Sequence, residues 1–371
     1  MKTDRFETFF DAIIAIIITV LVLKLLQPEQ ATWHAVWSLN TGYLTYLLCF
    51  LVIFNIWYND HCFFWIVDEI DNRVILAYGV LIFLISLLPY FSTWLLLNFF
   101  SLDSQVIFGL LFIVTHLVYT FTTYLICKRN PDNEILSNLD FLSLRRYVPN
   151  IIILVGIVLS CTVFVPATYI SCLVSTVIWI FIVRMPNSLT ENKGRFEALI
   201  DAIVAIIVTV IVLDLSMATG GSVYNLLELK LEFIAYIISF IVCFNYWVYH
   251  HYVFSRVNRI NYNVVWLTGA SVFILSLIPY LSKFVSENFY SIVAQSFYGL
   301  AFLLTLIFSI IMVNALNSIE GNNLEGFNRI FYMVLIIVIL GFIFAYLFYP
   351  PSIIFACLIS IFIVWIFKFI S

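Results

Sequence analysis

Charged residues are scarce in this chain. They make up 10% of the sequence, whereas a soluble protein of this length carries about 25%. Hydrophobic residues make up 64%, and the mean hydropathy is +1.09. The few Lys and Arg residues are too scattered to form a nucleic-acid-binding surface. The composition therefore indicates a polytopic membrane protein that is surrounded by lipid and binds no nucleic acid.

The sequence also lacks the spacings that carry chemistry. Its seven cysteines form no CxxC pair and lie mostly inside apolar runs, so we expect them to act as small core residues. No cluster of His, Cys, Asp and Glu has metal-ligand spacing, and neither a Gly-rich phosphate loop nor a nucleophile elbow is present. We therefore expect no metal, no cofactor, no catalytic residues and no enzymatic activity.

What the sequence has instead is apolar runs long enough to cross a bilayer, which takes about 20 residues in a helix. Backbone groups in lipid must be paired within their own segment, so these runs are expected to be helices. Pro166, and Pro350 with Pro351, are expected to turn two pairs of runs into tight hairpins. Twelve runs can be marked: 6–26, 43–66, 74–97, 105–127, 148–166, 168–184, 196–216, 232–254, 264–285, 293–316, 327–348 and 351–369.

The basic residues give the orientation of these helices. With the N-terminus inside, fourteen of the seventeen Lys and Arg residues fall on the cytoplasmic side and three on the other. This asymmetry is typical of the positive-inside rule, and it predicts that both termini are cytoplasmic.

The chain repeats itself at an offset of 190 residues without a gap. Residues 5–23 return as 195–213, Phe54-Asn55-Ile56-Trp57 returns at 244–247, and Leu88-Pro89-Tyr90 returns at 278–280. We expect an all-α protein of 12 transmembrane helices in two tandem six-helix repeats, 1–186 and 187–371. Because six is even, both repeats enter the membrane from the same side, as a parallel repeat. That geometry suits a central pore, although carriers with parallel repeats exist.

The first helix of each repeat carries charge that lipid disfavours: Arg5 and Asp11 in one copy, Arg195 and Asp201 in the other. Such residues normally face protein or water and mark functional sites. Asp11 and Asp201 could be structural ion-pair partners, a proton relay or part of a cation pathway, and we favour the structural role. His61, His250 and His251 end the second helix of each repeat beside Trp57 and Trp247. They either pair with these aspartates or form an interfacial His/Trp belt.

The opposite face of the same helices is apolar apart from a threonine. On a helical wheel Ile16, Thr19 and Leu23 share a stripe about 60° wide, and Ile206, Thr209 and Leu213 do the same in the second copy. Apolar rings can gate a pore by dewetting, and hydroxyls can replace part of a cation's hydration shell. The simpler alternative is a buried helix whose threonine bonds its own backbone.

Together these residues resemble the endosomal/lysosomal potassium channel family known as the transmembrane protein 175 family. Its R-x-x-x-F-S-D motif, followed by A-x-x-A-I-x-x-T, is matched at 5–19 and 195–209. Its W-x-x-H-H signature is matched fully at 247–251 and partly at 57–61, where Asp60 replaces the first histidine. Its L-P-[FY]-x-[ST] motif is matched at 88–92, and at 278–282 with isoleucine for the leucine. The family serine is Phe10 in one copy and Ile200 in the other, and its phenylalanine is Leu199 in the second.

The resemblance implies a potassium-permeable channel without the TVGYG filter, whose pore is lined by the first helix of each repeat. It implies a constriction at Ile16 and Ile206, a further apolar layer at Leu23 and Leu213, and a contribution to selectivity from Thr19 and Thr209. It also implies a network that braces the pore helix, formed by Arg5, Asp11, His61, Arg195, Asp201 and His251. Four repeats surround the pore in the family, so this chain is expected to form a homodimer with a pseudo-tetrameric pore.

Two other functions stay open on the sequence. One is a proton-coupled secondary transporter, or a proton-leak pathway, that uses the Asp/His network. The other is a partner-binding membrane protein with a closed seam of first helices. The short loops and the high use of Ile, Phe, Asn and Tyr resemble bacterial members. We therefore expect the cell membrane, with an endosomal or lysosomal membrane as the alternative.

Overall fold

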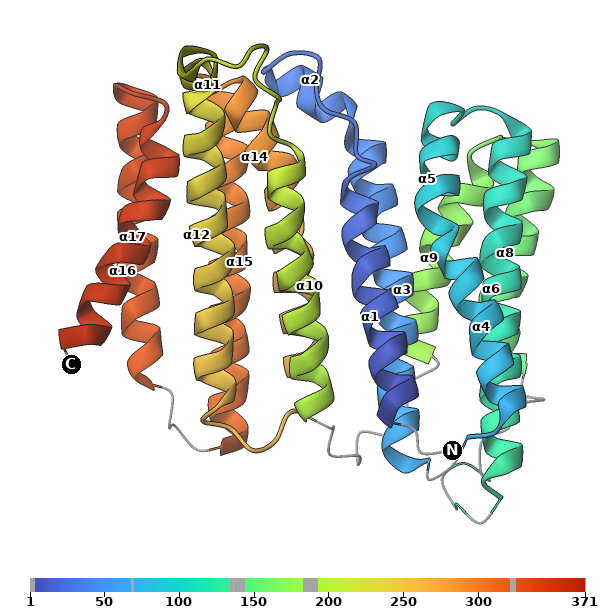
Figure 1. Cartoon of the computed structure of the whole chain (residues 1–371). Coiled ribbons are helices and arrows are strands. Elements are labelled where there is room, and N and C mark those ends of the chain that lie inside the picture. The colour runs from blue at the N-terminus through green and yellow to red at the C-terminus, as the bar shows by residue number, and fades with distance from the viewer. Residues whose placement is uncertain are drawn as a thin grey trace. The chain divides into compact units, whose positions relative to one another are not determined.

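The computed structural model describes residues 4–67, 70–131, 133, 136, 144–182, 193–320 and 325–370. Within these ranges every regular element is a helix (Figure 1). The helices form two compact units. The first comprises Met1–Leu25 and Thr41–Arg195, and the second comprises Leu26–Asn40 and Phe196–Ser371. The predicted boundary between 186 and 187 lies outside the described residues.

The first unit consists of the first repeat without the segment that follows its first helix. Its helices are α1 Asp4–Val22, α3 Asn40–Ile66, α4 Asn72–Ser86, α5 Leu88–Leu97, α6 Leu102–Arg129, α8 Leu144–Thr162 and α9 Ala167–Ile182. Helix α3 packs its whole length into this unit, and its residues from Asn55 to Phe64 are all buried. Its side chains in this stretch, Trp57 and Asp60 among them, therefore lie inside the protein.

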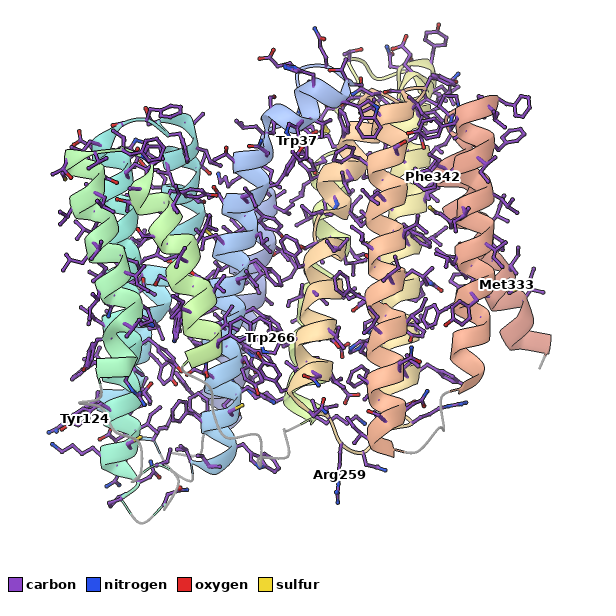
Figure 2. The ribbon with its side chains drawn as sticks, turned by 180° about the vertical axis from the view of Figure 1, so that it is seen from behind. Trp37, Tyr124, Arg259, Trp266, Met333 and Phe342 are labelled. Atoms are coloured by element: carbon purple, nitrogen blue, oxygen red, sulfur yellow. The ribbon has the colours of Figure 1, made fainter. Side chains whose placement is uncertain are left out.

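The second unit repeats this order and adds one helix from the first repeat. Its helices are α2 Trp33–Ser38, α10 Lys193–Leu213, α11 Val223–Glu228, α12 Lys230–Phe254, α13 Tyr262–Leu275, α14 Ile278–Glu287, α15 Ile292–Glu320, α16 Glu325–Leu347 and α17 Ser352–Ile370. Trp37, on α2, lies at the end of this unit opposite to Arg259 (Figure 2). Helices α2 and α11 lie at the same end (Figure 1).

Every one of the twelve predicted apolar runs is occupied by helix, but the count of twelve membrane spans is not confirmed. By length and composition, eight helical segments in the described ranges could cross a membrane. Helix α1 is not among them because Asp4, Arg5, Glu7 and Asp11 crowd its first turns, and α8, α9 and α17 contribute only shorter apolar stretches. The chain is a multi-pass membrane protein.

Two of the predicted runs are broken helices. The run at 74–97 is α4 followed by α5, and the run at 264–285 is α13 followed by α14. Each break precedes a proline, Pro89 or Pro279, which has no N–H to donate and clashes with the preceding turn. At the first break the hydroxyls of Ser92 and Thr93 both donate to the carbonyl of Pro89 (3.1 and 2.9 Å). The L-P motif therefore marks an interrupted span.

The predicted hairpins are helix pairs that pack closely through glycine. Helices α8 and α9 are joined through Val163–Pro166, and α16 and α17 through the Pro350–Pro351 turn. A methyl group added at Gly156 would overlap the side chain of Ser171 and lie 3.1 Å from the carbonyl of Ala167. Small residues allow membrane helices to approach in this way.

We expect Gly156→Ala to destabilise the protein. The added methyl meets backbone as well as the Ser171 side chain, and overpacking of this kind costs about 1–3 kcal/mol. Gly79→Ala is the matched control, since nothing lies within 4 Å of a Cβ at Gly79 and alanine is the better helix former. Thermal unfolding in detergent, followed by intrinsic fluorescence, should show a lower midpoint for Gly156→Ala only. Equal midpoints for the two variants would contradict the close packing of α8 on α9.

Candidate functional site

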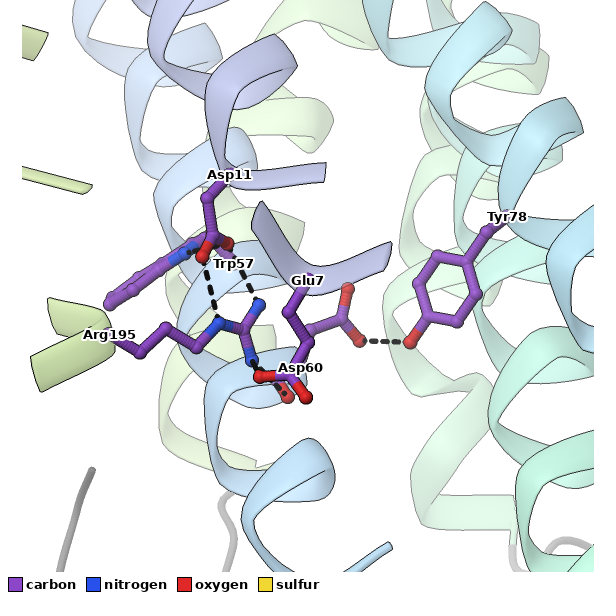
Figure 3. Close-up of polar contacts among 6 residues, drawn as sticks. All are labelled: Glu7, Asp11, Trp57, Asp60, Tyr78 and Arg195. Atoms are coloured by element: carbon purple, nitrogen blue, oxygen red, sulfur yellow. Dashed lines mark hydrogen bonds and ion pairs between the residues drawn. The ribbon is translucent and has the colours of Figure 1, made fainter. Parts of the chain in front are cut away.

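The polar centre of the first unit is a bidentate ion pair between Arg195 and Asp11 (Figure 3). The Nε atom of Arg195 donates to Oδ2 of Asp11 at 2.9 Å, and Nη2 donates to Oδ1 at 2.8 Å. Arg195 stands in the first turn of α10, and Asp11 lies two turns into α1. Both side chains are buried. A planar guanidinium matches a carboxylate in this fork geometry better than an ammonium does.

The rest of the guanidinium is also satisfied. Its Nη1 atom lies 3.4 Å from Oε2 of Glu7 and donates to the backbone carbonyl of Asp60 at 3.3 Å. The guanidinium carbon lies 5.1 Å from the centre of the Phe64 ring. Two elements of the first unit, α1 and α3, therefore meet on one cation. In a water-poor site such a pair is stable only while both partners remain, because either charge alone would be buried unpaired.

Trp57 ties the same carboxylate to α3. Its indole Nε1 donates to Oδ1 of Asp11 at 2.8 Å, and its ring stacks on His61 with centroids 4.9 Å apart. The second unit contains the equivalent arrangement. There Trp247 donates to Asp201 at 2.8 Å and stacks on His251 at 5.6 Å. The Asp–Trp–His set therefore recurs at the 190-residue offset.

Asp60 is a third carboxylate in the first unit's site. Its Oδ1 accepts a hydrogen bond from the hydroxyl of Tyr78 at 2.9 Å, and the side chain is 1% exposed. No described atom bonds its Oδ2, nor either ring nitrogen of His61. Buried polar atoms without a partner are rare and mark sites that hold water, a proton or another ligand. Three carboxylates and one guanidinium share this site.

The phenylalanine at the family's serine position is part of the packing here. Phe10 is fully buried, and its ring meets the edge of Tyr78 with centroids 5.4 Å apart. Phe6 packs on the same tyrosine at 5.1 Å. The ring of Tyr78 is therefore packed against phenylalanine side chains, while its hydroxyl donates the hydrogen bond to Asp60.

The apolar stripe of α1 lies on the side away from this site. Ile16 is 49% exposed and Leu23 is 41% exposed, together with Phe9 and Ala12 on the same face. Thr19 is buried, and its hydroxyl donates to the carbonyls of Ala15 and Ile16 (3.1 and 2.9 Å). The helix therefore separates an exposed hydrocarbon face from a buried charged one.

The corresponding stripe of α10 is exposed at different positions. Thr209 and Leu213 are exposed, whereas Ile206 is only half-buried. The hydroxyl of Thr209 donates to the carbonyl of Ile206 at 2.9 Å, as Thr19 does in the first copy. In both helices the threonine hydroxyl donates its hydrogen to the helix's own backbone, and only Thr209 is exposed.

Among the predicted network residues, the structure brings Asp11, Arg195 and His61 together and places Asp201 beside His251 through Trp247. Arg5 is exposed, and no described carboxylate pairs with it. Sequence reasoning missed Glu7 and Tyr78. Glu7 could have been found, since it returns as Glu197 at the 190-residue offset, whereas Tyr78 aligns with Thr268 and gave no signal.

The site holds no metal-type cluster. Within the described ranges, no three His, Cys, Asp or Glu side chains are placed to hold a metal ion. Six of the seven cysteines are buried, and Cys161 is exposed.

Comparison with known proteins finds a family that matches both copies of the motif. The family described as Endosomal/lysosomal potassium channel TMEM175 matches residues 5–89 and 195–279. A potassium channel of Chryseobacterium sp. (strain P1-3) is 33% identical over 132 residues, which are 36% of this chain and 69% of that protein. A potassium channel of Streptomyces collinus is 30% identical over 118 residues, 30% of this chain and 57% of that protein. One of Chamaesiphon minutus is 29% identical over 103 residues, 26% of this chain and 51% of that protein.

Arg195→Ala should destabilise the protein by about 3–5 kcal/mol, because it leaves the buried carboxylate of Asp11 without its cation. We expect the thermal midpoint in detergent to fall by roughly 10 °C. Arg73→Gln removes an exposed arginine from the first turn of α4 and serves as the control. If Arg195→Ala and Arg73→Gln unfold at the same temperature, the buried pair does not hold α1 in place.

Proposed function

The chain belongs to the endosomal/lysosomal potassium channel TMEM175 family, and from that membership we propose that it is a potassium-permeable cation channel. The family consists of channels rather than enzymes. The observation that carries the proposal is the position of the two family matches, which begin at Arg5 and Arg195 and so cover both first helices. These are the helices that combine an apolar exposed face with a buried charged one.

We assign the pore to the exposed faces of α1 and α10. Ile16 and Ile206 form the constriction, and Leu23 and Leu213 form a further apolar layer. The chain has no TVGYG sequence, so hydration and pore width replace a carbonyl filter. Support comes from α1, where Ile16 and Leu23 are exposed while Asp11 is buried on another face.

The threonines contribute to ion selectivity in this proposal. Thr209 is exposed on its helix, and its hydroxyl donates to the backbone carbonyl of Ile206. The hydroxyl of Thr19 donates to the backbone carbonyls of residues 15 and 16. The Thr209 hydroxyl, held in this way, presents only its oxygen, which can replace a water molecule around potassium, and we assign the same role to Thr19, which is buried in the single chain.

The ion pair braces the pore helix. Arg195, Asp11 and Trp57 fix the charged face of α1 against α3, and His61 stacks beneath the tryptophan. Because this bonding orients α1, it also determines which residues reach the exposed face. Arg5, Asp201 and His251 take the corresponding roles in the second copy.

A complete pore requires four first helices, so the functional form is a homodimer in lipid. In this proposal each chain contributes twelve transmembrane helices in the two repeats, with both termini cytoplasmic. The relatives above come from bacteria, which supports the cell membrane as the location.

The second candidate is a proton-coupled transporter or a proton-leak pathway. The observation that favours it is the buried pair Asp60 and His61, each with side-chain atoms that no described group bonds. A proton carried by Asp60 would reduce the excess of carboxylates over guanidinium in the site from two to one.

Flux measurements in liposomes separate the two candidates. We expect purified protein to conduct potassium when a potassium gradient is the only driving force, with a reversal potential in potassium/sodium bi-ionic solutions that shows preference for potassium. Transport that occurs only with a proton gradient, and that saturates at a low rate, would favour the carrier instead.

Ile16→Asn combined with Ile206→Asn should increase conductance, because an amide wets a constriction that isoleucine keeps dry. An increase of about tenfold corresponds to a barrier lower by ~1.4 kcal/mol. Leu76→Asn, at an exposed apolar position of α4, is the control and should leave conductance unchanged. Single-channel recording gives the comparison, and unchanged currents in the double variant would rule out the isoleucine constriction.

A further inference from the structure

A cavity recurs at equivalent places in the two repeats, and each copy lies inside a single unit. The first cavity has a volume of about 10 Å³ and the second of about 60 Å³. Five positions at the 190-residue offset line both: Val52, Leu88, Phe112, Thr115 and His116 in the first unit, and Val242, Ile278, Phe302, Thr305 and Leu306 in the second.

The difference in volume follows from larger side chains in the first unit. Tyr119 stands where the second repeat has Ser309, and the Trp179 ring, 4.1 Å from that of His116, lines the first cavity. About 10 Å³ is the least space that holds one water molecule. About 60 Å³ holds about two, or an organic molecule smaller than benzene, for which a cavity of about 150 Å³ is known. Of the two cavities, the second has room for an organic ligand.

The lining of the second cavity favours a neutral ligand that is partly apolar. None of the described residues that line it is acidic, basic or histidine. Its apolar wall includes Phe302, Leu306 and Phe331. The helices around it, α12 to α15, belong to segments that could cross a membrane. A charged ligand would therefore be unpaired in a medium of low dielectric constant.

Asn245 supplies a hydrogen-bond donor to this cavity. Its Oδ1 accepts a hydrogen bond from Nε1 of Trp365 at 2.9 Å, and this bond orients the amide. No other hydrogen bond joins the Asn245 side chain to a described residue. Its Nδ2 atom is therefore left to donate to a molecule in the cavity.

Thr305 and Ser309 supply acceptors from one face of α15. The Thr305 hydroxyl donates to the carbonyl of Ala301 at 2.9 Å, and the Ser309 hydroxyl donates to the carbonyl of Thr305 at 2.8 Å. Because both hydrogens are used within the helix, each hydroxyl can only accept from a ligand. A ligand that both accepts and donates a hydrogen bond matches these groups, and an alcohol hydroxyl does both.

The second cavity also lies beside the break in the interrupted span. Leu275 ends α13, Ile278 begins α14, and both residues line the cavity. Pro279 has no N–H, so the carbonyl of Leu275, four residues earlier, lacks its usual helical donor. Broken membrane helices are tolerated where side chains, water or other groups satisfy the released backbone. A molecule in the cavity therefore contacts both halves of the span at its weakest point.

We propose that the cavity of the second unit binds a small neutral alcohol of about three or four non-hydrogen atoms. Its hydroxyl accepts from Asn245 and donates to Thr305 or Ser309, and its hydrocarbon part packs against Phe302 and Leu306. Because the ligand binds the folded chain only, occupancy stabilises the protein against unfolding. The site is separate from the exposed faces of α1 and α10 and does not depend on the proposed function.

An alcohol fits better than the two simpler occupants. Water matches Asn245, Thr305 and Ser309 but gains nothing from the apolar wall, and each water needs two to four polar partners. A pure hydrocarbon matches the wall but leaves the three polar groups unmatched.

Two probes of equal size test the site. 2-Propanol and acetone have the same number of non-hydrogen atoms, but acetone has no hydrogen to donate. Ser309→Tyr fills the cavity with the residue that the first repeat has at this position. The thermal midpoint of the full chain in detergent is measured with and without each probe. 2-Propanol should raise the midpoint of the unchanged protein relative to Ser309→Tyr by about 2 °C, and acetone should raise it less. Comparing the two proteins removes the general effect of the solvent.

A second pair of variants tests the hydroxyl contact. Thr305→Val removes an acceptor and keeps the shape, so it should abolish the advantage of 2-propanol over acetone. Thr115→Val is the matched control, because Thr115 holds the equivalent place at the smaller cavity and its hydroxyl also donates to its own helix, at 2.7 Å from the carbonyl of Leu111. It should leave the advantage unchanged.

Three results would overturn the proposal. Equal shifts of the unchanged protein and Ser309→Tyr in 2-propanol would mean that the cavity holds water only. Equal effects of 2-propanol and acetone would remove the role of the hydroxyl, and so would an advantage that survives Thr305→Val. If Ser309→Tyr does not fold, the comparison of Thr305→Val with Thr115→Val decides alone. None of these measurements uses ion flux, so their outcome is independent of the channel assignment.

Discussion

A guanidinium can be buried away from water only where anionic groups balance its charge and acceptors bind its N–H groups. This requirement organises the first unit. Arg195 finds Asp11 and Glu7 on α1 and a carbonyl on α3, and Trp57 binds the same aspartate from α3. Removing any one of the charged partners would leave another charge unpaired in a low-dielectric site. The charged groups are therefore stable only together. The rotation of α1 about its own axis follows from that bonding.

The rotation of α1 links the buried charge to the exposed face. With Asp11 directed into the unit, Ile16 and Leu23 are left on the outside, and the threonine between them is held to its own backbone. A helix that had to satisfy Asp11 with water instead could turn more freely, and its apolar stripe would have no fixed direction. The direction of the apolar stripe therefore depends on groups on another face of the same helix. Phe10 takes the place of a hydroxyl in this arrangement by packing on Tyr78, which turns its own hydroxyl to Asp60.

Much of this architecture could be predicted from residues alone, because the signals were local or repeated. Long apolar runs predict helices, and the 190-residue offset predicts two similar units whose first helices carry an arginine and an aspartate. The pairing could not be predicted, since a helical wheel gives the direction of Asp11 but not the identity of the arginine that reaches it. Arg5 is in the same helix and was the nearer choice in sequence, yet Arg195 occupies the site. The packing of Leu26–Asn40 with the second unit could not be predicted either, because the transfer of one segment to the other unit leaves no periodic pattern in the sequence. The breaks at Pro89 and Pro279 were hidden for a different reason: both halves of each run are apolar.

The difference between Asp60 and His250 has a consequence for how such a protein can diverge. These two residues stand at equivalent positions of the two repeats, but one is acidic and the other is basic. A neighbouring position differs as well: Tyr78 bonds Asp60, and its equivalent in the other repeat is Thr268. In a channel built from identical single-repeat chains, any substitution appears in every subunit at the same time. A tandem duplication removes that restriction. Each half of the gene can explore its own polar chemistry, and an ionisable group can be introduced at alternate positions around an assembly while the remaining ones keep the ancestral residue.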